Sequence, residues 1–161
     1  MTQPALFIKM ALQAWEINSK RTITAFNSLT DEELYQEIAP GKNRAIYLLG
    51  HLTAVHDMMQ PLLGLGNRLY PQLDEAFITN ADKAIKILPP PKELREYWAH
   101  INEVLTQKLN SLGAEEWLQK HTMMNDEDFA KEPHRNKLNV LINRTNHLAY
   151  HLGQLALLKK G

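Results

Sequence analysis

The stretch LNVLINRTNHLAYHLGQL, residues 138–155, decides the fold class of this 161-residue chain. Apolar side chains recur along it every three or four residues, a spacing that indicates an amphipathic helix with one buried stripe. We expect the helix to begin near Pro133, which suits a first helical turn, and to run to about Lys159. Its predicted buried stripe consists of Leu138, Leu141, Ile142, Thr145, Leu148, Leu152 and Leu155.

Three more segments share this spacing, and no run of residues alternates convincingly as a β-strand would. The first is expected from about Ala5 to Asn27, the second after an N-cap at Asn43, and the third from near Pro91 to Gly113. Their predicted buried residues are Ile8, Leu12, Trp15, Ser19, Ile23 and Phe26, then Leu48, His51, Val55 and Met58, then Leu94, Tyr97, Trp98, Ile101, Val104, Leu105 and Leu109. The sequence therefore predicts an all-α four-helix bundle that forms one domain over residues 1–161.

The segments between these helices carry local signals of their own. Thr30 and Glu33 have the spacing of a capping box, which predicts a short helix at that point. A connection rich in Gly and Pro runs from residue 64 to residue 91, with room for one short helix around residues 73–85. The acidic run at residues 126–128 is expected to be a solvated loop.

The composition argues against several classes of function. Lys plus Arg equal Asp plus Glu at 18 each, so no net field favours nucleic acid, an anionic membrane or an acidic partner. Without Cys, the chain has no disulfide, thiolate metal ligand or cysteine nucleophile. Residues 1–15 do not read as a signal peptide, and the most apolar run, residues 45–55, is shorter than the ~20 residues of a membrane-spanning helix. We therefore predict a cytoplasmic protein that binds neither nucleic acid nor membrane.

Three histidines are the candidate metal ligands. His147 and His151 are four residues apart, so both rings lie on one face of a helix, although this spacing alone is a weak signal. His51 lies among apolar residues of the second helix, where a buried imidazole needs partners for both ring nitrogens. For one such residue, a core histidine bonded to a carbonyl is the commoner outcome. Three inward-facing histidines on two helices favour a shared divalent metal ion.

The register of the two helices supports this grouping. His51 lies about eight residues after Asn43 and His151 about eight before Lys159, each about 12 Å from that helix end. The histidines are therefore level only if the second and fourth helices run antiparallel. The long connection allows this, because it lets the third helix run parallel to the second in an up-down-down-up order. Surface or rim positions are expected for the other histidines, His56, His100, His121 and His134.

The two histidine-bearing segments, LLGHL at residues 48–52 and HLAYHLGQ at residues 147–154, resemble the DinB-like family of four-helix bundles. This family includes the YfiT-type proteins, which are regarded as metal-dependent enzymes. Its pattern is one histidine in the second helix and His-x-x-x-His-x-Gly-Gln in the last. The resemblance implies a site for nickel, zinc or a similar ion at His51, His147 and His151. It spans essentially the whole chain, with no family-specific match in residues 65–91.

The resemblance also implies a reaction class. Related bundles include transferases that activate small thiols such as bacillithiol or mycothiol, and a thiol-dependent isomerase. The leading prediction is therefore a metal-dependent thiol S-transferase whose small-molecule substrates include a low-molecular-weight thiol. A metal-dependent hydrolase, a non-catalytic metal-binding or interaction bundle, and a bundle without metal are the alternatives, and no catalytic residue is assigned. A homodimer along helix faces is predicted because Ile17, Leu157 and Leu158 are candidates for partial exposure.

Overall fold

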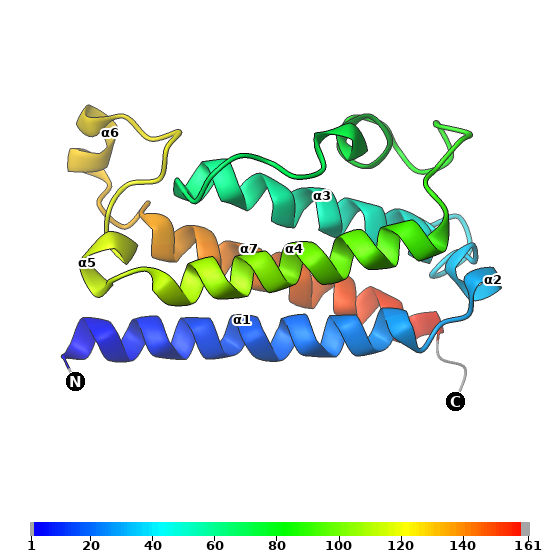
Figure 1. The fold of residues 1–161 in the computed structure, drawn as a ribbon, viewed down its shortest axis with the longest axis horizontal. Helices are drawn as coiled ribbons and strands as arrows, with labels where there is room; N and C mark the ends of the chain where they lie inside the picture. The colour runs from blue at the N-terminus through cyan, green and yellow to red at the C-terminus, as the bar shows by residue number, and fades with distance from the viewer. Residues whose placement is uncertain (1, 159–161) are drawn as a thin grey trace.

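The computed structural model describes residues 2–158, and the all-α prediction is confirmed (Figure 1). The long helices are α1 (Gln3–Asn27), α3 (Ala45–Leu63), α4 (Pro91–Ser111) and α7 (Lys137–Leu155). Shorter elements are α2 (Asp31–Leu34), α5 (Ala114–Trp117), α6 (Asp126–Lys131) and the turns η1 (Pro71–Leu73), η2 (Glu75–Thr79) and η3 (Ala156–Leu158). No β-strand forms within this part of the chain. None of its helices is both long and apolar enough to cross a membrane.

The four long helices pack side by side in two directions. Figure 1 shows α3 and α4 running from the end of the bundle near α2 toward the end near α5, while α1 and α7 run the opposite way. The most extensive contacts are between α1 and α7 and between α3 and α4. Two polar contacts fix the parallel register of α3 and α4, from Lys108 to Gln60 and between His56 and Asn102. Helices α3 and α7 are therefore antiparallel, as the level placement of the three histidines requires.

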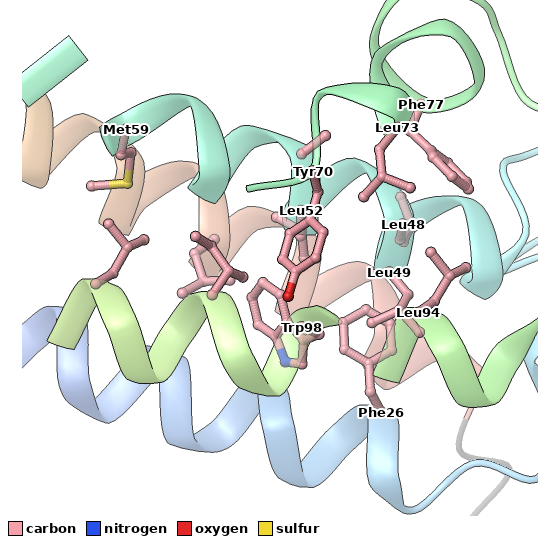
Figure 2. Close-up of a cluster of buried hydrophobic side chains, with 14 of the residues drawn as sticks. Phe26, Leu48, Leu49, Leu52, Met59, Tyr70, Leu73, Phe77, Leu94 and Trp98 are labelled. Carbon is pink, nitrogen blue, oxygen red and sulfur yellow. The ribbon is translucent and has the colours of Figure 1, made fainter. Parts of the chain in front are cut away.

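Helix α3 is the most buried element of the bundle. It packs against α4 and α7, and the connection that contains η1 and η2 lies along its remaining side. Figure 2 shows side chains from four parts of the chain meeting around it: Phe26 of α1, Leu48, Leu49 and Leu52 of α3, Leu94 and Trp98 of α4, and Leu73 and Phe77 of the connection. Burial of each such side chain contributes about 1.5–3 kcal/mol.

The connection from α3 to α4 is ordered by a buried carboxylate. Asp57 accepts hydrogen bonds from the backbone N–H groups of Leu69 and Tyr70 at 2.7 and 2.9 Å and pairs with Arg68 at 3.0 Å. The short helix expected around residues 73–85 is instead the 3₁₀ turn η1 followed by the π-helical turn η2. Their Leu73 and Phe77 are buried, so packing against the rest of the bundle stabilises these turns.

Several predicted helix ends were wrong. Asn43 is not the N-cap of α3, because Arg44 takes that place and its backbone N–H donates to Asp82 at 2.7 Å. Helix α7 begins after Asn136, whose side chain accepts from the backbone N–H of Asn139, and not at Pro133. The predicted acidic loop forms the first turn of α6, where carboxylates stabilise the helix dipole.

One predicted helix cap is confirmed, and two side chains that were predicted to be buried are more exposed than expected. The capping box of Thr30 and Glu33 is present before α2. Ile142, which was predicted to lie in the buried stripe of α7, is 43% exposed, so the buried stripe is narrower than the apolar pattern suggests. Met58 is only half-buried, while its neighbour Met59 is fully buried.

Candidate metal centre

The three predicted histidines come together at the interface of α3 and α7. Nε2 of His147 lies 3.3 Å from Nε2 of His51 and 3.0 Å from Nε2 of His151. One nitrogen from each ring lies within 4.8 Å of the others. Two imidazole nitrogens on one tetrahedral Zn²⁺, each about 2.0–2.1 Å from the ion, are about 3.3 Å apart. The cluster thus has the donor type and nearly the spacing of a three-histidine metal site.

Hydrogen bonds on the far side of two rings fix which nitrogen carries the proton. His51 Nδ1 donates to the carbonyl of Phe77 at 2.8 Å, and His151 Nδ1 faces Oε1 of Gln154 at 2.7 Å. The Gln154 amide is oriented by its Nε2–H, which donates to the Tyr150 hydroxyl at 3.0 Å. Because a carbonyl oxygen only accepts, Nδ1–H is the donor in both rings and each Nε2 presents a lone pair.

The π-helical turn η2 brings the Phe77 carbonyl within hydrogen-bonding distance of His51 Nδ1. Gly50 makes this approach possible, because a Cβ at that position would lie 2.3 Å from the Phe77 ring. Tyr47, one turn earlier, stacks parallel to the His51 ring with centroids 6.1 Å apart, and its hydroxyl donates to the Asn80 carbonyl at 2.8 Å. The connection thus contacts α3 at Tyr47, Gly50 and His51.

The local environment keeps the three imidazoles neutral. Desolvation by burial is the largest cause that lowers the pKa of His51, His147 and His151, and it brings the pKa of His147 to about 4. No Asp or Glu belongs to the cluster within residues 2–158. His151 is buried, whereas His51 and His147 are half-buried and keep part of their surface exposed to solvent.

His56 corrects the prediction that the other histidines lie at the surface or rim. It is 0% exposed, its ring lies between Trp15 and Trp98 with centroids at 4.6 and 4.8 Å, and its Nδ1 is 3.0 Å from Asn102 Oδ1. Its position about 140° around the helix from His51 suggested an outer face. The structure instead places this side of α3 in the bundle interior, where it faces Trp15 of α1 and Trp98 and Asn102 of α4.

The other histidines lie apart from this cluster. His100 and His134 are exposed, and His100 Nδ1 is 2.6 Å from the Tyr70 hydroxyl. His121 is half-buried in the segment between α5 and α6. The sequence did not single out the Phe77 carbonyl, since its link to His51 spans 26 residues, and Gln154 appeared only as part of a motif.

We expect Gly50→Ala to lower the free energy of unfolding by about 1–3 kcal/mol, because the new methyl group must displace the Phe77 ring from a packed interior. Chemical denaturation measures this change. Gly153→Ala is the matched control, since a Cβ there meets nothing within 4 Å and Ala favours a helix. Equal stability losses in the two variants would contradict this role of Gly50.

Sequence similarity to a known protein family covers most of the chain. The sequence profile described as the DinB superfamily matches residues 14–155, a range that includes all three histidines. No curated protein matches the chain.

Proposed function

The chain belongs to the DinB superfamily, and we propose that it binds one divalent metal ion through Nε2 of His51, His147 and His151. The convergence of these nitrogens is the observation that supports the proposal. His51 and His151 both present Nε2 lone pairs toward His147, at 3.3 and 3.0 Å. A proton on His147 Nε2 would satisfy only one of them, whereas a cation satisfies all three.

The chemistry of the donors favours Zn²⁺ or Ni²⁺. Imidazole nitrogen suits both ions, and a ligand set without carboxylate oxygens argues against Mg²⁺ and Ca²⁺. The Phe77 carbonyl and the Gln154 side chain would orient His51 and His151 through hydrogen bonds, as residues that contact metal ligands do in other metal proteins. Three protein ligands leave at least one coordination position for a substrate.

We propose a thiol S-transferase as the activity. A divalent ion at this site would supply a Lewis acid that lowers the pKa of a bound thiol. The chain has no Cys, so the thiol is a substrate that comes from outside. In the reaction the sulfur forms a bond to an electrophilic carbon, the leaving group departs with its electron pair, and the thiol proton passes to solvent. The thiol would reach the site past the solvent-exposed parts of the half-buried His51 and His147.

Cobalt substitution tests this proposal. We expect Co²⁺-loaded protein to develop a sulfur-to-metal charge-transfer absorption when 2-mercaptoethanol is added, and no such band with ethylene glycol. The same titration on His147→Ala controls for free Co²⁺. If no band develops with any small thiol at neutral pH, the transferase proposal fails and a hydrolase, which would activate water at the same position, becomes the better candidate.

The remaining functional expectations stay predictions. These are a single domain over residues 1–161, a cytoplasmic location and a homodimer. Ile17 and Leu157 are 43% and 64% exposed, which leaves apolar surface for such a dimer, whereas Leu158 is half-buried.

A further inference from the structure

Arg144 is a half-buried cation beside the three histidines with no partner of its own. It lies on α7, three residues before His147 and seven before His151, so all three share one face of the helix. Within residues 2–158 it makes no ion pair or hydrogen bond, yet its nitrogen atoms are not sealed from solvent. By contrast, the half-buried Arg44 and Arg68 each pair with aspartate.

The charge around Arg144 is positive. Arg144 lies one helical turn before His147 on the same face of α7, which places its positive charge beside the histidine cluster. Burial alone lowers the pKa of Arg144, and no carboxylate among residues 2–158 pairs with it. A divalent ion held by three neutral imidazoles would add to this positive charge. An anion bound at this site would balance the two positive charges.

A second donor on the same stretch of α7 also lacks an acceptor. When Nε2 of His147 faces the other two histidines, its Nδ1 carries the proton, and this atom is buried without a partner in the described part of the chain. The corresponding atoms of His51 and His151 do have acceptors. Helix α7 therefore carries two donors that lack an acceptor in the described part of the chain. Only the Arg144 guanidinium is open to solvent, and it would be stabilised by an anionic oxygen.

We propose that Arg144 binds the carboxylate of a small ligand that occupies the site beside His51, His147 and His151. This inference rests on the proposed metal function and narrows its substrate class to molecules that carry a carboxylate. The planar guanidinium matches a carboxylate through two parallel hydrogen bonds. The carboxylate and the metal ion then bind cooperatively, because each reduces the unfavourable charge that the other meets.

Calorimetric titration of Zn²⁺ into the full chain, with and without sodium acetate, tests the coupling. We expect acetate to tighten Zn²⁺ binding to the wild type by roughly tenfold, the range of one charged hydrogen-bonded pair. In Arg144→Gln, Zn²⁺ should bind without acetate at least as tightly as to the wild type, because a repelling charge is gone, and acetate should have no effect. Arg144→Lys should keep part of the effect. Arg135→Gln is the matched control, since Arg135 is exposed and pairs with Glu132.

Each other outcome overturns the inference. An equal acetate effect in wild type and Arg144→Gln would mean that the anion contacts the metal alone. Weaker Zn²⁺ binding by Arg144→Gln without acetate would indicate a structural role. Both results leave the metal centre in place, so they are distinguishable from a wild type that binds no Zn²⁺ in either buffer, which would overturn the proposed function as well.

Discussion

Replacing His147 by alanine is expected to lower the affinity for Zn²⁺ or Ni²⁺ by more than about 100-fold. Loss of a residue that only hydrogen-bonds to a metal ligand already lowers metal affinity by about 10–100-fold, and loss of the ligand itself should cost more. His147 lies between the other two histidines, within 3.3 Å of both Nε2 atoms, so its loss removes the central donor. His51→Ala and His151→Ala should have comparable effects. Elemental analysis and calorimetry of protein without a histidine tag measure them.

The control for this experiment follows from the fold. His100→Ala should retain the metal, because His100 is exposed and belongs to a separate contact with Tyr70. His56→Ala is a poor control, because removal of a fully buried ring between two tryptophans would itself destabilise the protein. Equal metal content in the wild type and all three ligand variants would rule the site out.

Acidification is expected to destabilise the metal-free protein through His56. Burial lowers the pKa of this imidazole from 6.5 to about 3 in the folded chain. Below pH 6.5 the unfolded chain therefore takes up a proton that the folded chain does not, and stability falls by about 1.4 kcal/mol per pH unit for this group. The contribution is complete above pH 6.5 and is lost as the pH falls toward about 3.

Urea denaturation at a series of pH values measures how the free energy of unfolding depends on pH. This dependence should be weaker in His56→Gln, because glutamine keeps a hydrogen-bonding amide for Asn102 but does not titrate. The cluster histidines, His147 among them, add to the slope in both proteins, so the difference isolates His56. NMR of the wild type provides a second measurement, in which the His56 ring signals should not titrate between about pH 7 and pH 5. An unchanged slope together with a titrating ring would contradict the assignment.

Much of the fold followed from the sequence because its signals are local. The 3.6-residue apolar pattern predicted the long helices, and the capping box at Thr30 predicted α2, since both depend on residues a few positions apart. Helix ends were less predictable. Asn43 has the chemistry of a cap, yet the backbone N–H of Arg44 is satisfied by Asp82, 38 residues away.

The sequence by itself determined the helical class, the three converging histidines and the absence of a cysteine nucleophile, because periodicity and residue chemistry are properties of short segments. Only the tertiary structure decided that η2 covers α3, and hence that the Phe77 carbonyl orients His51. It also decided that His56 is buried between Trp15 of α1 and Trp98 of α4. The tertiary structure likewise decided that Arg144 is half-buried on α7 without a carboxylate partner among residues 2–158. Burial and pairing of this kind depend on residues that are distant in sequence and meet only when the chain folds, so no local pattern records them.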